Sequence, residues 1–415
     1  MSDLHSGKDG AAIAVLLAAI RDAQRDRHRS QGVIAQGGMG SIEGVHDRLL
    51  ERGVVLKRIH EELERDPKQA YMFVREARVT GQLAHPSVVP VHELGADDEG
   101  HLYYTMERVE GRTLEEWVSS LPPGPLDKSV LFDLLDVVVR VCDALRYAHN
   151  AGVLHCDVKP ANVMVGEFGQ VYLMDWGIAR SLAEEREREP GQGELTGTPA
   201  WMAPEQGRNE RLDERADVFA AGALIYYILT RRAPFIAEGL IQTLVNAVLC
   251  TYPHPDAVEG VGRPPPALTR IVVRAMAAKR EDRYASAGEL RDALVRFMRG
   301  VDAFPRVLVG TDEDVVVEGE PGSEAYVIES GILEVHRMID GKKTSIRLMG
   351  PGEVFGEMAV LSPGVRTATV TALEPSVVLR ITADTLQAEV DSMKPWMGAL
   401  VRTLAERFRE RESTR

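Results

Sequence analysis

The sequence predicts an α+β protein with more than one domain, on three observations. The chain has 415 residues, which is too long for one hydrophobic core and fits two or three domains. Short β-rich runs punctuated by glycine fill residues 31–110, and a mostly helical pattern follows over 111–300. From about residue 304, short strands with closely spaced glycine turns return, which is typical of a small β-barrel or β-roll. We therefore expect domains over residues 31–300 and 304–413.

The pattern of residues 1–30 predicts an N-terminal helix and a polar connector. The apolar run Ala11–Ile20 is too short for a membrane span, which needs about 20 residues. A signal peptide is the alternative, but Asp3 and Asp9 precede this run, where a signal peptide carries a basic segment. The other long apolar run, Val218–Leu229, is also too short. We predict no membrane span.

The net charge of the chain limits which partners it can bind, and its cysteines indicate the redox state of its compartment. A formal net charge of -14 argues against nucleic acid or an anionic membrane as the main partner, because both need a basic surface. Cys142, Cys156 and Cys250 are widely spaced and make neither a disulfide framework nor a metal-ligand cluster. A reducing, cytoplasmic compartment is the simplest interpretation. The oligomeric state and the protein substrate do not follow from composition.

Several segments have a clear local pattern. A helical stretch over residues 67–83 interrupts the first β-rich region. Lys128–Asn150 carries apolar residues at helical spacing and ends before Gly152, a natural C-terminal stop. Residues 183–194 are charged and contain glycine, which predicts a loop, and residues 381–413 return to a helical pattern.

The first of five motifs, which follow one another in order along the chain, is a glycine-rich hairpin. It runs Ile-Ala-Gln-Gly-Gly-Met-Gly-Ser-Ile, from Ile34 to Ile42. Because they are small, Gly37, Gly38 and Gly40 let the hairpin backbone close over phosphates and offer N–H donors to them. Alone this is a weak signal, since glycine-rich turns are common.

A basic and an acidic residue form the second and third motifs. Lys57 ends a β-like run, Val-Val-Leu-Lys, and can supply a cation to phosphates. Glu76 lies in the helical stretch Phe-Val-Arg-Glu-Ala-Arg and is a suitable ion-pair partner for Lys57. On its own, Glu76 would be a solvated charge on a helix, which is the usual fate of a glutamate.

The fourth motif, His155–Asn162, brings an Asp, a Lys and an Asn to one loop. Asp157 offers a carboxylate to a substrate hydroxyl, Lys159 a cation to the transferring phosphoryl group, and Asn162 an oxygen ligand to magnesium. The fifth motif, Asp-Trp-Gly after a strand, supplies a second metal ligand in Asp175. Magnesium prefers oxygen ligands and keeps its waters, so these two residues suffice beside ATP oxygens.

Together these motifs resemble bacterial serine/threonine protein kinases of the eukaryotic-like family, from about Val33 to Gly300. The segments GGMG, HPSVVPV, MERVEGRTL, HCDVKPAN, GTPAWMAPEQ and DVFAAG match that family in order and spacing. The resemblance implies a two-lobed protein kinase fold. It also implies transfer of the γ-phosphate of ATP to serine or threonine hydroxyls of a protein substrate, with Mg²⁺ as cofactor.

The resemblance implies a role for each motif residue. Lys57 holds the α- and β-phosphates and is anchored by Glu76. Asp157 accepts the hydroxyl proton, and Lys159 meets the γ-phosphate. Asn162 and Asp175 ligate magnesium.

The same resemblance assigns residues outside the five motifs. Met106 sits at the gatekeeper position, and Glu107 to Val109 form the hinge against adenine. Glu205 is expected to pair with Arg283 as a contact that holds the fold. Two further expectations are that Asp217 braces the catalytic loop, and that Lys159 with Thr198 marks serine/threonine rather than tyrosine specificity.

Three positions depart from the family pattern. Ala35 replaces the first glycine of the hairpin, which costs little unless that position needs a positive φ. Trp176 replaces a phenylalanine, so the apolar side chains around it must accommodate a larger ring. Cys156 stands where the family often has an arginine that pairs with a phosphorylated activation-loop residue.

Cys156 leads to a hypothesis about control of the kinase. Cysteine cannot bind a phosphate as arginine does, and the candidate phosphosites are few: Ser181, Thr196 and Thr198. We hypothesise that activity does not require phosphorylation of the activation loop. The alternative is that Cys156 reflects sequence drift alone.

The C-terminal region contains an anion-binding pattern in Phe355–Val370. Gly356 permits close backbone approach, Glu357 can accept a hydrogen bond from a ribose hydroxyl, and Arg366 offers a fork of donors to a phosphate. Backbone N–H groups near Met358 and Ala359 are expected to point the same way. A buried arginine is costly unless an anion meets it. The alternative is a salt bridge between Glu357 and Arg366 in an empty roll.

This segment resembles the phosphate-binding cassette of cyclic nucleotide-binding domains, and the resemblance extends over about residues 306–410, with turns at Gly319, Gly322 and Gly331. It implies a β-roll with C-terminal helices and cyclic AMP or cyclic GMP as ligand. Thr367 points slightly to cyclic GMP, whose guanine amino group a hydroxyl can meet, although members that prefer cyclic AMP also have it.

The base-capping lid would come from the helices after Thr382. Met393 and Trp396 are candidates for it, and packing between helices is an equal alternative for both.

The sequence therefore predicts a protein kinase modulated by a cyclic nucleotide. A pseudokinase scaffold with a sensor domain is the alternative, but Lys57, Asp157, Asn162 and Asp175 are all retained, whereas pseudokinases usually lose one. A third possibility is a C-terminal domain that serves only as a docking or dimer surface.

Overall fold

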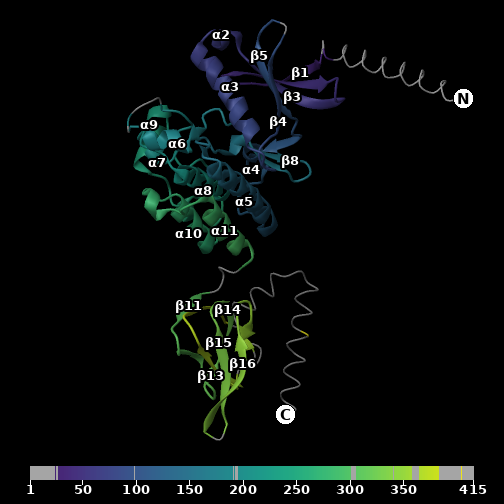
Figure 1. Cartoon of the computed structure of the whole chain (residues 1–415). Helices are drawn as coiled ribbons and strands as arrows, with labels where there is room; N and C mark the ends of the chain where they lie inside the picture. The colour runs from purple at the N-terminus through teal and green to yellow at the C-terminus, as the bar shows by residue number, and fades with distance from the viewer. Residues whose placement is uncertain are drawn as a thin grey trace, which may run out of the picture. The chain divides into compact units, whose positions relative to one another are not determined.

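The computed structural model describes residues 27–97, 99–189, 195–300, 305–339, 341–357 and 364–382, with the single residues 24, 191 and 403. The chain divides into two compact units, Met1–Val295 and Arg296–Arg415 (Figure 1). The helices expected before residue 31 and after Thr382 lie outside the described residues, as do Met358, Ala359, Met393 and Trp396.

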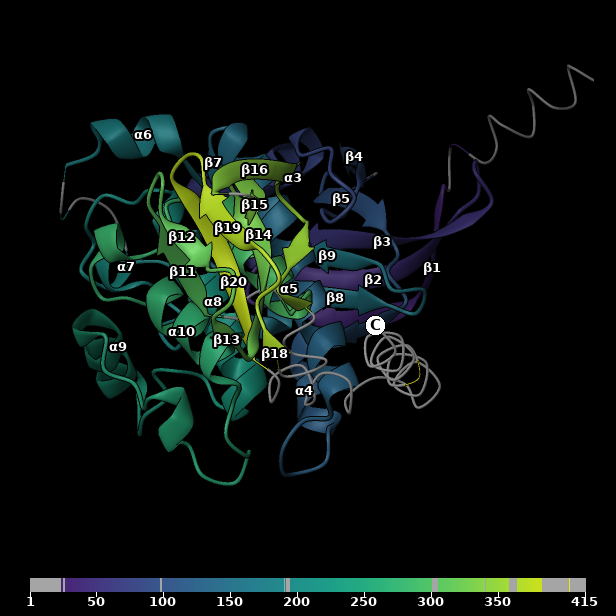
Figure 2. The same cartoon turned by 90° about the horizontal axis from the view of Figure 1, so that it is seen from below.

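The first unit opens with a five-stranded antiparallel sheet in the order β1-β2-β3-β5-β4. The paired strands β1, β2 and β3 run side by side in Figure 2. The strand β1 already begins inside the predicted connector. The bounds are β1 (His28–Gln36), β2 (Gly40–Asp47), β3 (Arg52–Ile59), β4 (Val91–Ala96) and β5 (Leu102–Glu107).

Helix α3 (Pro67–Gln82) follows the short helix α2 (Glu61–Glu64) and covers this sheet. Asp66 caps α3, because its side chain accepts a hydrogen bond from the backbone N–H of Lys68 at 2.9 Å. The residues that α3 buries lie on one helical face, at positions i, i+3, i+4 and i+7: Phe73, Glu76, Ala77 and Thr80. The helix predicted from local pattern is therefore confirmed, and its buried face includes a carboxylate.

The rest of the first unit is mainly helical. The predicted helix Lys128–Asn150 is α5, with the same bounds, and it packs against α8 (Glu214–Thr230). Nearly all of α8 is buried, which explains its apolar run as core. No helix in the described parts of the chain is long and apolar enough to span a bilayer. The other helices are α4 (Leu114–Ser120), α6 (Leu182–Glu187), α7 (Pro204–Gly207), α9 (Leu240–Leu249), α10 (Pro266–Ala275) and α11 (Ala287–Met298).

Two small sheets carry the polar motifs. The three-stranded sheet β6-β8-β9 and the pair β7-β10 lie among the helices. The loop with Asp157 connects β7 to β8, and the loop with Asp175 connects β9 to β10. The strands are β6 (Gly111–Thr113), β7 (Val153–Leu154), β8 (Val163–Gly166), β9 (Val171–Leu173) and β10 (Arg180–Ser181).

The second unit contains the β-roll that the glycine-punctuated pattern predicts. Two four-stranded antiparallel sheets, β11-β20-β14-β17 and β12-β19-β15-β16, enclose an apolar core, and β13 pairs with β18. The strands are β11 (Arg306–Val309), β12 (Asp314–Val316), β13 (Pro321–Gly322), β14 (Glu324–Ser330), β15 (Leu333–Ile339), β16 (Lys342–Met349), β17 (Val354–Phe355), β18 (Gly364–Val365), β19 (Thr369–Ala372) and β20 (Ser376–Thr382).

Candidate functional site

A buried ion pair joins the sheet and α3 of the first unit. The Nζ of Lys57 lies 2.6 Å from Oε1 of Glu76, and the hydroxyl of Tyr104 donates to the same oxygen at 2.7 Å. Glu76 is 3% exposed, so the solvated-helix alternative for this residue is wrong. Burial and the nearby Glu76 charge raise the pKa of Tyr104 well above its usual value, which keeps it a neutral hydrogen-bond donor.

Backbone hydrogen bonds and a close backbone contact fix the glycine-rich turn between β1 and β2. The backbone N–H of Gly37 donates to the carbonyl of Gly40 at 2.9 Å, and that of His60 to the carbonyl of Met39 at 3.2 Å. A Cβ added at Gly40 would lie 1.9 Å from the carbonyl oxygen of Arg58. Only glycine fits there, because the two backbones approach so closely.

The other positions of this turn are less constrained. An added Cβ would meet nothing within 4 Å at Gly38, and Ala35 does not have a positive φ. The departure from glycine at Ala35 therefore needs no unusual backbone conformation. Ile34 is 56% exposed, whereas Ile42 packs against the core of the sheet.

The residues expected to face adenine continue from β5. Met106 is buried and belongs to the same apolar cluster as Val55 and Tyr104. The backbone N–H of Glu107 donates to the carbonyl of Pro90 at 2.9 Å, and Val109 packs against the cluster as a half-buried side chain. These residues border the apolar core beside Lys57.

The β7–β8 loop gathers a closed polar cluster. The Nζ of Lys159 lies 2.6 Å from Oδ2 of Asp157 and donates to the hydroxyl oxygen of Thr198 at 2.8 Å. That hydroxyl donates to Oδ1 of Asp157 at 2.8 Å. The amide nitrogen of Asn162 donates to the carbonyl oxygen of Asp157 at 2.9 Å. The motif residues and Thr198, far apart in sequence, therefore converge on one carboxylate.

Asp175 stands close to the Lys57–Glu76 pair. A Cβ built at Gly177 would lie 3.1 Å from Oδ1 of Asp175 and 3.3 Å from Oε2 of Glu76. Asp175 is exposed and has a φ of 61°, an uncommon conformation for a residue with a side chain. Its carboxylate can therefore reach a ligand in solvent, whereas Asn162 is 7% exposed.

Asp217 braces the loop between β7 and β8, as predicted. Its Oδ1 accepts from the backbone N–H of Cys156 at 2.9 Å, and its Oδ2 from that of His155 at 2.9 Å and from the ring of His149 at 2.8 Å. Burial alone would raise the pKa of Asp217. The hydrogen bond and charge of His149 keep this pKa below its usual value. The carboxylate stays ionised and fixes the backbone before Asp157.

Glu205 and Arg283 form the predicted pair. Their contacts are bidentate, 2.6 Å from Nη1 to Oε1 and 2.7 Å from Nη2 to Oε2, and both residues are 3% exposed. Arg283 also donates to backbone carbonyls of Arg215 and Ala277 at 2.9 and 2.8 Å. The remaining donors are thus satisfied, which is what a buried guanidinium requires.

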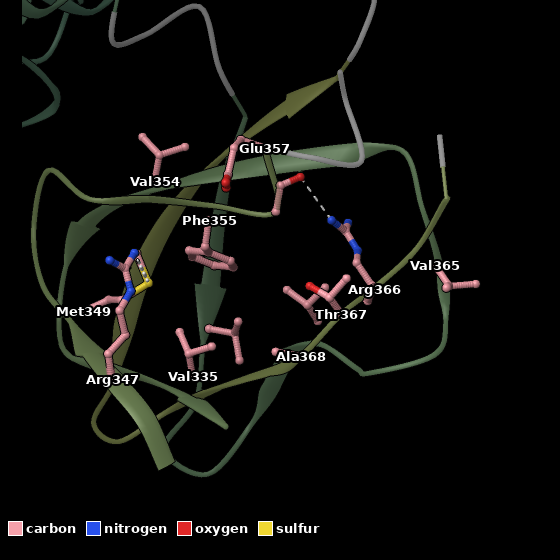
Figure 3. A pocket seen from close by; sticks show the side chains of 13 residues that line it. Val335, Arg347, Met349, Val354, Phe355, Glu357, Val365, Arg366, Thr367 and Ala368 are labelled. Carbon is pink, nitrogen blue, oxygen red and sulfur yellow. Dashed lines mark hydrogen bonds between the residues drawn. The ribbon is translucent and has the colours of Figure 1, made fainter. Parts of the chain in front are cut away.

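A pocket opens in the roll of the second unit (Figure 3). It is lined by apolar side chains together with two arginines, a glutamate and a threonine: Val316, Val335, Arg347, Met349, Val354, Phe355, Gly356, Glu357, Val365, Arg366, Thr367, Ala368 and Val370. The structure thus brings Gly356, Glu357, Arg366 and Thr367 to one cavity.

Arg366 is the unusual member of this pocket. It is 9% exposed, donates from Nη1 to the carbonyl of Gly356 at 3.3 Å, and has a buried Nε without a hydrogen-bond partner. An added Cβ would lie 2.2 Å from Nε at Gly322 and 2.7 Å from Nη1 at Gly356. Within the described residues no carboxylate pairs with Arg366, so the Glu357–Arg366 salt bridge is absent there.

Comparison with known protein families identifies the family of the first unit. Residues 28–288 match the protein kinase domain family. This chain belongs to the protein kinase family. Residues 307–392 match the cyclic nucleotide-binding domain family. The predicted combination, a kinase fold followed by a β-rich cyclic nucleotide-binding domain, is confirmed.

Two curated relatives and one solved structure are each similar to about two thirds of this chain. Serine/threonine-protein kinase PknD of Chlamydia caviae is 31% identical over 68% of this chain and 32% of its own length. Serine/threonine-protein kinase PknB of Mycobacterium leprae is 33% identical over 72% of this chain and 47% of its own length. A crystal structure of a double mutant of the Mycobacterium tuberculosis PknI kinase domain superposes with a TM-score of 0.50 at 25% identity, covering 66% of this chain and 96% of that one. The chain thus spans about a third to a half of these two curated relatives.

The kinase domain accommodates its departure at Trp176. This side chain is fully buried, its indole N–H donates to the carbonyl of Leu173 at 3.2 Å, and its ring packs 4.5 Å from that of His155. The larger ring therefore has both a packing partner and a hydrogen-bond acceptor.

The activation segment, residues 177–203, carries the candidate phosphosites. It also contains a buried carboxylate that the sequence did not predict. Glu185 is 4% exposed, and its oxygens accept from Arg180 at 3.0 Å, from the backbone N–H of Leu212 at 3.0 Å and from Arg188 at 3.4 Å. Arg180 also donates to the hydroxyl of Thr196 at 3.1 Å.

The prediction of a loop over residues 183–194 is wrong at its start, because Leu182–Glu187 is helix α6. Ser181 caps this helix and Glu184 lies three positions on, a spacing that could have signalled the helix start. The burial of Glu185 had no such local signal.

Proposed function

We propose that this chain is a serine/threonine protein kinase that transfers the γ-phosphate of ATP to hydroxyls of a protein substrate. One observation carries the proposal: the cluster of Asp157, Lys159, Thr198 and Asn162 beside a paired Lys57. The names of the curated relatives support it, although they are longer proteins. Transfer needs charge stabilisation and positioning more than covalent chemistry, and this arrangement supplies both.

Each group in the cluster has a task in this reaction. Asp157 is held by hydrogen bonds from Thr198 and Asn162 and accepts the proton of the attacking hydroxyl. Lys159, 2.6 Å from Asp157, neutralises the charge that develops on the phosphoryl oxygens. Lys57 is fixed by Glu76 and holds the other phosphates. The β1–β2 turn could offer backbone N–H groups to these phosphates, apart from that of Gly37, which donates to the carbonyl of Gly40.

Asn162 and Asp175 fit a magnesium ion. The amide nitrogen of Asn162 is used by Asp157, which leaves its oxygen as a ligand, and the Asp175 carboxylate is exposed. Both donors are oxygens, as magnesium prefers. Bound magnesium would neutralise charge on the phosphates of ATP. Met106, Glu107 and Val109 would then meet adenine.

For the second unit we propose a cyclic nucleotide, cyclic AMP or cyclic GMP, as an effector of the kinase. The buried Nε of Arg366 without a partner supports an anionic ligand, since leaving such a donor unmet costs free energy. Gly322 and Gly356 leave room around the guanidinium that a side chain would fill. Glu357 lines the same pocket as an acceptor for a ribose hydroxyl, and Thr367 adds a hydroxyl.

The activation segment supports our hypothesis that loop phosphorylation is not required. Glu185 already places a carboxylate against Arg180 and Arg188, which is the role that a phosphate plays where the loop is phosphorylated. The Cys156 thiol is buried, and burial with the charge of Asp217 raises its pKa well above the usual value. The thiol therefore stays neutral and adds no charge to this cluster.

One assay on the full chain tests the enzyme and its effector. Purified protein is incubated with Mg-ATP and a generic protein substrate, with and without each cyclic nucleotide, and Asp157→Asn is the inactive control. We expect transfer that falls about 10²- to 10⁴-fold in the variant, the usual contribution of a general base. Asp136→Asn, at an exposed surface pair, is the matched control and should match wild type.

The outcomes separate the alternatives. Transfer no greater than in Asp157→Asn would favour a pseudokinase scaffold. Transfer that neither nucleotide changes, with Arg366→Ala behaving as wild type, would favour a docking role for the second unit.

A second assay tests the activation segment. Thr196→Ala should keep near-full activity, whereas Glu185→Gln should lower it, because Arg180 and Arg188 lose their counter-charge. Loss of activity in Thr196→Ala that Thr196→Glu restores would contradict the hypothesis.

A further inference from the structure

The backbone of Cys156, the residue before Asp157, has an uncommon conformation. Its φ is 66°, in the left-handed region that few residues with a side chain adopt. Such a conformation persists only where the surrounding structure holds it. Because the two residues are adjacent, the groups that fix the backbone of Cys156 also set the direction of the Asp157 side chain.

Both backbone polar groups of Cys156 bond to side chains from other parts of the chain. Its N–H donates to Oδ1 of Asp217 at 2.9 Å. Its carbonyl oxygen accepts from the amide nitrogen of Gln206 at 2.7 Å. Gln206 is 5% exposed and lies in α7, next to the buried Glu205. The residue before Asp157 is therefore held at its N–H and at its carbonyl.

The same amide of Gln206 holds a second segment. Its nitrogen also donates to the carbonyl oxygen of Thr196 at 3.1 Å. A carbonyl oxygen can only accept, so the atom that faces both carbonyls must be the NH2 group, which has one hydrogen for each. A Cβ added at Gly197, whose φ is 114°, would lie 2.8 Å from this nitrogen. Glycine therefore lets the activation segment pass close to the amide.

The two carbonyls that Gln206 holds lie near the two ends of one hydrogen bond in the polar cluster. Cys156 precedes Asp157, and Thr196 lies two residues before Thr198. The hydroxyl of Thr198 donates to Oδ1 of Asp157 at 2.8 Å. By holding both backbones, Gln206 fixes this donor relative to its acceptor, and thereby the orientation of the Asp157 carboxylate.

We propose that Gln206 is a positioning residue for phosphoryl transfer, which aligns Asp157 through the backbone rather than by contact with a substrate; this inference rests on the proposed kinase activity. Loss of Gln206 should slow the chemical step, because a small misplacement of a catalytic group can cost about a hundredfold in rate. Binding of ATP should not change, since Lys57 is fixed separately by Glu76.

Steady-state kinetics of the full chain with Mg-ATP and a generic protein substrate test this role. Gln206→Met keeps an unbranched side chain of similar length but has no N–H donor. We expect its kcat to fall about ten- to a hundredfold, with KM for ATP unchanged. Titration calorimetry with ATP should give the wild-type stoichiometry, which shows that the variant is folded. Gln242→Met, at an exposed glutamine of α9, is the matched control and should behave as wild type.

A double-mutant cycle tests whether Gln206 acts through the Thr198–Asp157 hydrogen bond. Thr198→Val removes the hydroxyl that donates to Asp157. In this background Gln206→Met should lower kcat by a smaller factor than in wild type, because groups in one hydrogen-bond network are not additive. A residue that only stabilised the fold would lower kcat by the same factor in both backgrounds.

Gln206→Glu is a second variant, for the case that Gln206→Met binds ATP with reduced stoichiometry. It has the same shape, but its ionised carboxylate sets acceptors against the two carbonyl oxygens. It should show the same loss in kcat without a change in KM for ATP.

Each failure points to a different conclusion. Wild-type kcat in both Gln206 variants, or equal factors in the double-mutant cycle, would overturn the role of Gln206 and leave the kinase activity intact. A loss that lies in KM for ATP rather than in kcat would also overturn it. Transfer by wild type no greater than by Asp157→Asn would overturn the proposed activity, and this inference with it.

Discussion

The kinase domain and the roll each bury an arginine, but they differ in how many of its hydrogen-bond donors find an acceptor within the protein. Arg283 of the kinase domain meets Glu205 through two hydrogen bonds and has backbone acceptors for other donors. Arg366 of the roll is similarly buried, yet among the described residues it has one hydrogen bond, to Gly356, and its Nε has no partner. The first arrangement is complete within the protein, whereas the second leaves a donor for the ligand that we propose. A buried charge that the protein leaves unmet therefore marks a binding site better than burial alone.

The largest expected effect on stability comes from breaking the complete pair. Glu205→Ala leaves the guanidinium of Arg283 buried without its carboxylate, which costs about 3–5 kcal/mol in the free energy of unfolding. Urea unfolding monitored by the fluorescence of Trp117, Trp176 and Trp201 measures this change in the kinase domain. Glu210→Ala, which removes an exposed partner of Arg280, is the matched control and should cost less than about 1 kcal/mol.

A smaller loss is expected at a second complete pair, Arg27 with Asp47. Arg27 donates to both carboxylate oxygens, at 3.1 and 2.9 Å, and the backbone N–H of Leu49 adds a third hydrogen bond. Against the effect of burial, these contacts lower the pKa of Asp47 from 3.8 to about 2. The ionised form is therefore favoured in the folded state, and its contribution is fully present above pH 4.

This stabilisation should disappear as the pH falls from about 4 to about 2, through the folded-state pKa of Asp47. At pH 7 we expect Asp47→Asn to lower the free energy of unfolding by about 2 kcal/mol, from the size of that pKa shift. Near pH 2 the variant and wild type should converge. A constant difference at both pH values would show that packing, not charge, accounts for the loss.

The smallest effect on stability is expected at the incomplete site. Arg366→Ala removes a buried cation whose donors are not all satisfied, so the unfolding of the roll, measured by scanning calorimetry without ligand, should shift by no more than about 1 kcal/mol. With cyclic nucleotide added, wild type should gain thermal stability and the variant should not. If Arg366→Ala lowered the free energy of unfolding as much as Glu205→Ala does, Arg366 would contribute to stability as Arg283 does, and the proposed difference between the two arginines would be wrong.

Much of the kinase domain could be predicted because its signals are local. Helix α5 has the predicted bounds, since its apolar spacing and the following Gly152 are both features of adjacent residues. The β-roll was predicted in the same way, from short strands and glycine turns. The order of the motifs indicated which side chains would meet, and the cluster around Asp157 contains Lys159 and Asn162 from one loop.

The sequence by itself determined which residue types lie at each motif and the period of each helix and strand. Only the tertiary structure decided which charged side chains are buried and whether each has an ion-pair or hydrogen-bond partner. Glu185 lies in a run of charges that predicts a solvated loop, yet distant segments bury it against Arg180 and Leu212. The physical reason is that the cost of burying a charge depends on partners far away in the chain.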